Sequence, residues 1–74
     1  MKYVVLNNLE LYLFPPHISH GDFLDRVARP GQDSCTGAGF VSADWKCYGE
    51  SVGLGIGRGR TDSSLLAAAV RGMN

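Results

Sequence analysis

Two histidines and two cysteines are the residues whose types are best suited to chemistry in this chain: His17, His20, Cys35 and Cys47. Imidazole and thiolate are the usual ligands of zinc, but structural zinc sites bring cysteines in pairs about two to four residues apart. Cys35 and Cys47 are separated by eleven residues, which does not fit such a pair. A cysteine beside a histidine could act as a nucleophile, but this spacing does not favour it. The sequence therefore predicts no metal site and no cofactor.

Hydroxyl and carboxyl groups give no catalytic motif either. None of the six serines lies in a Gly-x-Ser-x-Gly elbow, and the seven acidic residues are dispersed along the chain. The sequence therefore favours a protein that is not an enzyme.

A glycine-rich run is the feature that most resembles a ligand-binding loop. Glycine occupies alternate positions from residue 49 to residue 59, except that Ser51 takes one of them. A predicted helix follows, and helix N-termini attract anions through free amides and the helix dipole. The Walker and dinucleotide patterns are both absent. The alternative function is therefore a small-anion or nucleotide-phosphate site on residues 57–63, and its candidate residues are Arg58, Arg60, Thr61, Asp62 and Ser63.

Three aromatic residues, Phe40, Trp45 and Tyr48, cluster around a predicted hairpin turn. Tryptophan and tyrosine dominate the energetics of protein interfaces, so these rings are candidates for binding a partner. They could equally be cross-strand pairs that fill a small core. Both interpretations stay open from the sequence.

The elements that must position these residues begin with a predicted hairpin. Lys2–Leu6 and residues 9–14 are apolar, strand-like runs that flank Asn7-Asn8. Asparagine tolerates the left-handed conformation of tight hairpin turns. A two-residue turn pairs Leu6 with Leu9, and one face of the hairpin then carries the aliphatic residues Val4, Leu6, Leu9, Leu11 and Leu13.

Two short helices are expected from their punctuation. Ser19 is the predicted N-cap of the first, and Pro30-Gly31 follows its end. Thr61 or Asp62 is the predicted N-cap of the second. Its narrow apolar stripe consists of Leu65, Leu66, Ala69 and Val70.

A second hairpin is predicted from residues 36–42 and 45–56, turning at Ala43-Asp44. This register pairs Phe40 with Cys47 and leaves the two sulfurs on opposite sheet faces, roughly 16 Å apart along the strands. That separation exceeds the limit of about 7 Å between the Cα atoms of a disulfide, so both thiols should be free and largely buried. Its glycine-rich face would be nearly bare and open to close approach by a neighbour.

A resemblance covers about half of the chain. Gly37-Ala38-Gly39-Phe40-Val41, followed by Cys47-Tyr48-Gly49-Glu50-Ser51-Val52-Gly53-Leu54-Gly55, resembles a group of small bacterial and phage proteins. That group has an A-G-F-V strand and a C-Y-G-x-S-x-S-L-G strand. An acidic, serine-containing turn and a leucine-bearing helix come next, as residues 62–66 do here; Gly53 stands where the group has serine. The resemblance implies strands for these segments and brings no assigned activity.

Composition limits the classes of function. The 74 residues allow one domain, and seven basic residues balance seven acidic ones, which argues against nucleic-acid binding. No apolar stretch approaches the length of about 20 residues that spans a bilayer. The start Met1-Lys2-Tyr3 reads as structure and not as a targeting signal, so the expected location is the cytoplasm.

These observations together predict a single α+β domain with the order ββαββα. Two antiparallel hairpins form one sheet, and both helices cover one of its faces. A short, neutral, apolar chain gains stability from a partner, and low net charge favours association. The expected function is a small non-enzymatic protein-interaction module that binds a protein partner or itself, the latter as a homodimer, with no nucleic acid and no membrane.

Overall fold

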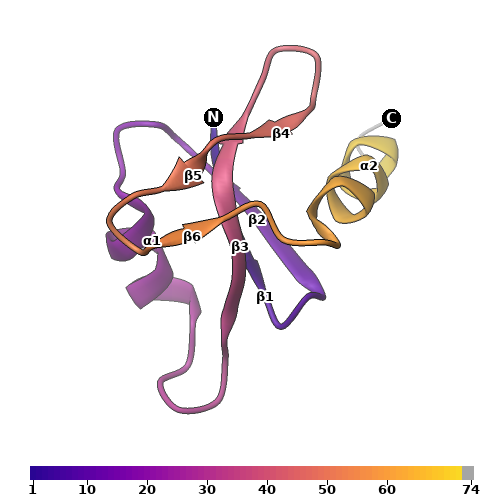
Figure 1. Ribbon diagram of the computed structural model, residues 1–74. Coiled ribbons are helices and arrows are strands. Elements are labelled where there is room, and N and C mark those ends of the chain that lie inside the picture. Colours follow the sequence, from indigo (N-terminus) through magenta and orange to yellow (C-terminus); the bar gives the residue numbers. More distant parts are fainter. Residues whose placement is uncertain (73–74) are drawn as a thin grey trace.

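The computed structural model describes residues 1–72 as a small α+β fold with two helices and an antiparallel sheet (Figure 1). The class agrees with the prediction, but the order of elements is ββαββββα instead of ββαββα. In chain order the elements are β1 (Lys2–Leu6), β2 (Glu10–Phe14), α1 (His20–Val27), β3 (Cys35–Val41), β4 (Cys47–Tyr48), β5 (Glu50–Ser51), β6 (Ile56–Gly57) and α2 (Asp62–Gly72).

The strands form two antiparallel sheets and not the predicted single one. The larger sheet has the order β2-β1-β3-β4, and β5 pairs only with β6. The predicted strand over residues 45–56 is wrong because glycine breaks it twice. Gly49 and Gly55 take positive φ angles of 70° and 68°, a left-handed conformation that bends the chain. The glycine-rich run is therefore a bend and a hairpin turn, and it offers no continuous bare face.

The first hairpin has the predicted turn but a different register. Asn7 and Asn8 have φ angles of 56° and 53°, as such a turn requires. Leu6 nevertheless lies opposite Glu10 and not Leu9, because Leu9 is an extra loop residue whose N–H closes the turn on the Leu6 carbonyl. A shift of one residue moves every side chain of β2 to the other face. The predicted aliphatic face is therefore wrong, and Leu9 is 71% exposed.

The second hairpin shifts in the same way. Val41 pairs with Cys47 and Phe40 with Tyr48, instead of Phe40 with Cys47. The loop gains a residue because Trp45 adopts a left-handed φ of 61°, the position that glycine usually takes in three-residue hairpin loops. Both cysteines are free, as predicted, but only Cys47 is buried; Cys35 is half-buried.

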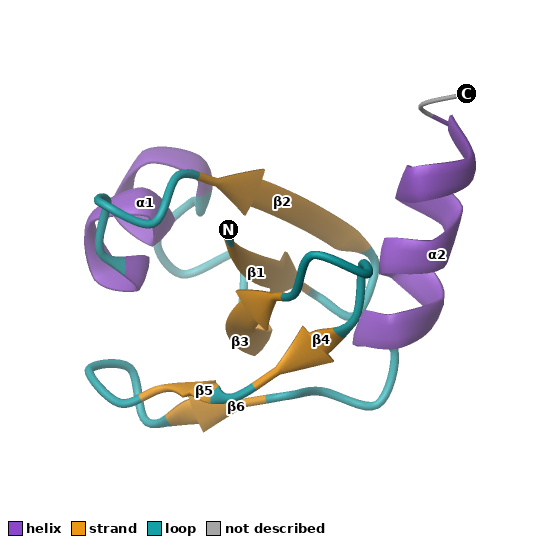
Figure 2. Ribbon diagram, turned by 90° about the horizontal axis from the view of Figure 1, so that it is seen from above, coloured by secondary structure: helices purple, strands orange, loops and turns teal. Residues whose placement is uncertain are grey.

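The core lies on both faces of β1. The prediction that both helices cover the same face of the sheet is therefore wrong. Tyr3 and Val5 pack with Leu66 of α2, while the alternate residue Val4 belongs to a second cluster. Phe23 of α1 and Leu54 of the β5–β6 hairpin complete that second cluster. Since side chains alternate along a strand, α2 covers one face of the sheet, and α1 with the small hairpin covers the other (Figure 2).

The helix boundaries follow the predicted signals closely. The hydroxyl of Ser19 caps α1 by accepting the N–H of Asp22 at 3.1 Å. The inward stripe of α2 is as predicted, with Leu66 buried and Leu65, Ala69 and Val70 half-buried. Neither of the helices described within residues 1–72 has the length and apolar character needed to cross a membrane.

Candidate functional site

Asp62, one of the predicted anion-binding residues, is a structural residue buried at the start of α2. Its side chain is completely inaccessible, and its Oδ2 atom accepts hydrogen bonds from the Tyr3 hydroxyl at 2.6 Å and the Gly59 N–H at 2.8 Å. A Cβ at Gly37 would collide with this carboxylate, so glycine in β3 makes room for it. Asp62 therefore ties α2 to the centre of the sheet, and its carboxylate is not exposed to solvent.

Burial sets the acid–base behaviour around Asp62. The pKa of Tyr3 is raised well above its usual range, first by burial and then by its hydrogen bond to Asp62. Burial also raises the pKa of the Cys47 thiol. Of the buried side-chain polar atoms described, Asp62 Oδ1 is the one that has no hydrogen-bond partner. A phenol and a thiol that stay protonated are poor nucleophiles.

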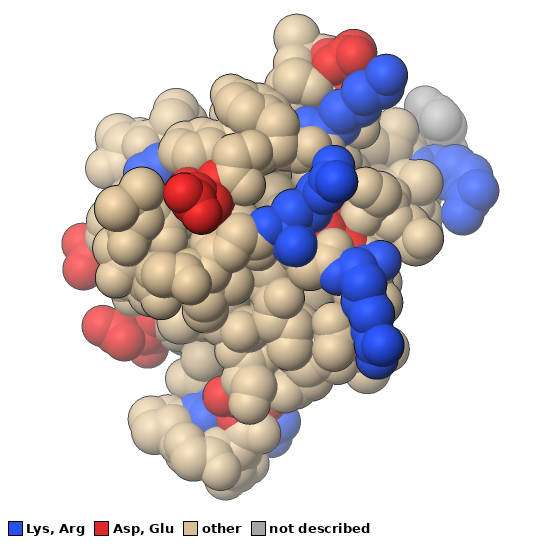
Figure 3. Space-filling model, viewed as in Figure 1, with Lys and Arg blue, Asp and Glu red and all other residues tan. Residues whose placement is uncertain are grey.

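The remaining anion-binding candidates are only partly brought together. Arg58 and Ser63 line a hollow of about 330 Å³ between the β3–β4 loop and α2, and Lys46 and Cys47 are among its other lining residues. Lysine and arginine side chains gather on the α2 side of the molecule (Figure 3). Arg60 is exposed and does not line the hollow, and Thr61 donates its hydroxyl to Asn8 Oδ1 at 3.3 Å.

The three aromatic candidates do not form one surface. Phe40 and Tyr48 stack with ring centroids 5.6 Å apart, and Phe40 also meets the buried ring of His20 edge-on. Trp45 instead lies in the β3–β4 loop, where it lines the hollow that contains Lys46 and Cys47. Tyr48 and Trp45 are 53% and 40% exposed, so each leaves substantial apolar area accessible.

The apolar surface around Met1 was not predicted from the sequence. Met1 lies between a hollow of about 500 Å³, lined by Leu13, Phe14, Pro15 and Pro16, and a second of about 340 Å³ lined in part by Val41 and Trp45. We call these two hollows together the Met1 surface. Pro15-Pro16 at the end of a strand was the available signal, but only the fold places these prolines beside Met1.

The backbone of β1 directs its polar groups to its two neighbours in alternation. The Met1 carbonyl accepts the Val41 N–H, and the Asn7 N–H donates to the Ser34 carbonyl, both at 2.8 Å. Val41 ends β3 and Ser34 precedes it, so the odd-numbered residues of β1 face β3. The even-numbered residues consequently face β2.

The outer edge of β2 is therefore open at two residues. Because Val4 pairs with Tyr12, the N–H and C=O groups of Tyr12 face β1. Those of its neighbours Leu11 and Leu13 must then point away from the sheet. Within the described chain no strand lies beyond β2, which Figure 2 shows as the outermost strand. We call the outward backbone groups of Leu11 and Leu13 the β2 edge.

The histidines and cysteines do not form a metal centre. His17 is exposed, whereas His20 is buried and its Nε2 atom donates to the Gly39 carbonyl at 2.8 Å. Among residues 1–72, no three His, Cys, Asp or Glu side chains come close enough to hold a metal ion.

Comparison with protein-family models, with curated proteins and with solved structures gave no match.

Proposed function

We propose that this chain is a small protein-interaction module that self-associates by pairing its β2 edge with that of a second copy. The observation that carries the proposal is the pair of outward-facing backbone groups at Leu11 and Leu13 on the outermost strand. Unpaired N–H and C=O groups at a sheet edge are a template for another strand.

The β2 strand lacks the residues by which proteins usually protect such edges. Protected edges are very short or carry lysine, proline or a bulge within the strand. β2 has five residues, its one charged residue is Glu10 at its start, and Pro15 comes only after its end. Its middle residues Leu11, Tyr12 and Leu13 are half-buried, so pairing would remove further apolar surface from water.

Antiparallel pairing of two β2 strands has a defined geometry. With the twofold axis at Tyr12, Leu11 of each copy lies opposite Leu13 of the other. Each of these two pairs exchanges two backbone hydrogen bonds, which gives four across the interface. The result would be one continuous eight-stranded sheet.

The Met1 surface supplies apolar area next to this edge, since Leu13 belongs to both. A standard protein interface takes about 800 Å² from each partner, which is about a sixth of the 4629 Å² surface of this chain. A neutral chain has little net repulsion to oppose pairing. Because the edge itself is only five residues long, we expect micromolar affinity. The proposal includes a cytoplasmic location, which the two free thiols favour.

Sedimentation equilibrium of the native chain and two variants tests the proposal. Leu13→Pro removes the outward N–H at a position where an edge strand tolerates proline, and Leu13→Ala is the matched control that loses the same apolar contacts. Proline removes two of the four hydrogen bonds, each worth about 1 kcal/mol, so its dimer should be roughly thirtyfold weaker than that of Leu13→Ala. A native chain that stays monomeric up to millimolar concentration, or equal weakening by both variants, would contradict the proposal.

A second candidate function, binding of a small anion or a nucleotide phosphate, is favoured by the hollow that joins Arg58 and Ser63 with Lys46. Titration with inorganic phosphate and with ATP should shift the amide resonances of Ser63 and Ser64. Arg58→Gln should abolish this shift, whereas Arg26→Gln, an exposed change on α1, should leave it intact. Resonances that do not move at millimolar ligand would remove this candidate.

A further inference from the structure

A pocket separate from the β2 edge lies between the start of α1 and the β5–β6 hairpin. Its volume of about 460 Å³ is in the range of small-molecule sites, and its lining combines apolar side chains with several polar ones. We propose that this pocket, the hairpin pocket, binds a zwitterionic α-amino acid with an apolar side chain. The proposal does not depend on self-association.

Opposite charges on the pocket wall select for a zwitterion. Lys2 and Glu50 both line the pocket, and neither makes a salt bridge within residues 1–72. The Lys2 ammonium donates one hydrogen bond, to the Ile18 carbonyl at 2.9 Å, and keeps two N–H groups for a ligand. A ligand carboxylate would pair with Lys2, and a ligand ammonium with Glu50. A molecule with a single charge would satisfy only one of the two.

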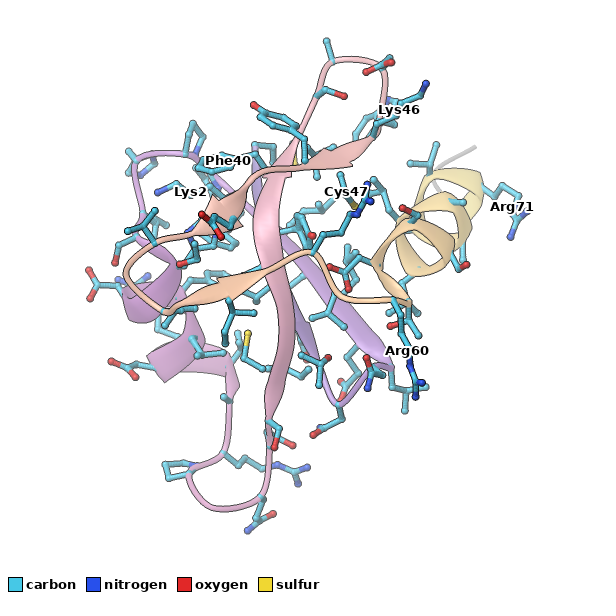
Figure 4. The ribbon with its side chains drawn as sticks, in the orientation of Figure 1. Lys2, Phe40, Lys46, Cys47, Arg60 and Arg71 are labelled. Atoms are coloured by element: carbon cyan, nitrogen blue, oxygen red, sulfur yellow. The ribbon has the colours of Figure 1, made fainter. Side chains whose placement is uncertain are left out.

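The apolar part of the pocket comes from β3 and from the β5–β6 hairpin. Phe40 lies opposite Lys2 in the β1–β3 register, so the ring and the ammonium-bearing side chain share one face, and both are labelled in Figure 4. Leu54 and Val52 of the hairpin line the pocket as well, and Val52 is 84% exposed. These side chains would contact the apolar side chain of the ligand.

Two buried polar residues give the pocket hydrogen-bonding groups of fixed orientation. His20 donates through Nε2 to the Gly39 carbonyl, and its ring is held edge-on to the rings of Phe14 and Phe40. No described residue bonds to its Nδ1 atom. The Ser51 Oγ atom accepts the Leu54 N–H at 3.3 Å, so its own proton remains available for a ligand carboxylate.

Titration of the full chain with L-phenylalanine, followed by amide resonances, tests the proposal. We expect saturable shifts at Ser51, Gly53 and Leu54 in the millimolar range. 3-Phenylpropionate keeps only the carboxylate and phenethylamine only the ammonium, and each should bind roughly fivefold more weakly than the amino acid.

Charge variants then assign the two ends of the ligand. Glu50→Gln should weaken the binding of L-phenylalanine and phenethylamine but leave that of 3-phenylpropionate unchanged. Lys2→Gln should weaken the binding of L-phenylalanine and 3-phenylpropionate but leave that of phenethylamine unchanged. Asp25→Asn and Arg26→Gln, exposed changes outside the pocket, are the matched controls. Absence of saturable shifts, or equal weakening of the binding of all three ligands by Glu50→Gln, would overturn the proposal. The Glu50→Gln test can be made even if Lys2→Gln fails to fold.

Discussion

Removing the Tyr3 hydroxyl should strongly destabilise the fold. Tyr3 and Asp62 are both completely buried, and their hydrogen bond of 2.6 Å joins β1 to the start of α2. In Tyr3→Phe the carboxylate keeps one donor, the Gly59 N–H, and its Oδ1 atom has none among the described residues. Hydrogen bonds to charged groups contribute about 1.5–3 kcal/mol, so we expect a loss of about 2–3 kcal/mol. For a domain of this size that lowers Tm by about 10–20 °C.

Urea unfolding followed by circular dichroism measures this loss, with Tyr12→Phe as the control. The Tyr12 hydroxyl also bonds to a carboxylate, Glu10 Oε2 at 3.0 Å, but this pair is exposed. Exposed polar substitutions usually change stability by less than about 0.5 kcal/mol. If Tyr3→Phe costs no more than Tyr12→Phe, the buried hydrogen bond does not hold α2 to the sheet as argued.

The dependence of stability on alkaline pH gives a second test of the burial of Tyr3. Because burial raises the pKa of Tyr3 in the native state, unfolded Tyr3 loses its proton first as pH rises above about 10. The native state then binds more protons than the unfolded state, so stability falls with increasing pH by up to about 1.4 kcal/mol per pH unit. Tyr3→Phe lacks this contribution, and its stability should fall less steeply than that of the native chain.

Three further predictions concern other parts of the fold. Trp45→Gly should be more stable than Trp45→Ala by about 1 kcal/mol in urea unfolding, because alanine keeps the cost of the left-handed φ and glycine does not; equal stabilities would contradict this strain. A thiol reagent should modify half-buried Cys35 before buried Cys47, as mass spectrometry of the labelled peptides would show; faster labelling of Cys47 would refute its burial. Arg29 holds the pKa of Asp33 well below its usual range, so this carboxylate stabilises the fold at pH values above its pKa in the unfolded chain and stabilises it less as pH falls. Asp33→Asn should therefore reduce the fall in Tm at acid pH. An unchanged fall in Tm would contradict this prediction.

Local signals in the sequence predicted the helices and the positions of the turns, but not the turn lengths. Ser19 caps α1, and the apolar stripe of α2 lies inward, because capping and helical periodicity are local properties. The registers of both hairpins were wrong by one residue. Leu9 and Trp45 each add a residue to a loop that the sequence suggested was shorter, and a bulky residue such as Trp45 gives no sign that it will adopt a left-handed φ.

The sequence did contain a signal for the placement of the helices, but we interpreted β1 as a strand with alternating, half-buried faces. Tyr3, Val4, Val5 and Leu6 are four consecutive apolar residues, and such a run is typical of a strand buried on both faces. All four are buried, so both faces of β1 need cover and the two helices lie on opposite sides.

The candidate sites depended on contacts between distant segments. Arg58 and Ser63, two of the anion-binding candidates, line one hollow, but the sequence could not show that Asp62 turns inward to meet Tyr3, 59 positions away. The open edge at Leu11 and Leu13 follows from strand order, which residue patterns alone do not determine.

Amide hydrogen exchange at β2, measured at low and at high protein concentration, tests the proposed self-association most directly. The Leu11 and Leu13 N–H groups face outward, while the Tyr12 N–H faces β1 and serves as an internal control. We predict that exchange at Leu11 and Leu13 slows markedly between micromolar and millimolar protein, while exchange at Tyr12 is slow at both. Exchange at Leu11 and Leu13 that stays fast at every concentration would contradict the pairing of the β2 edge.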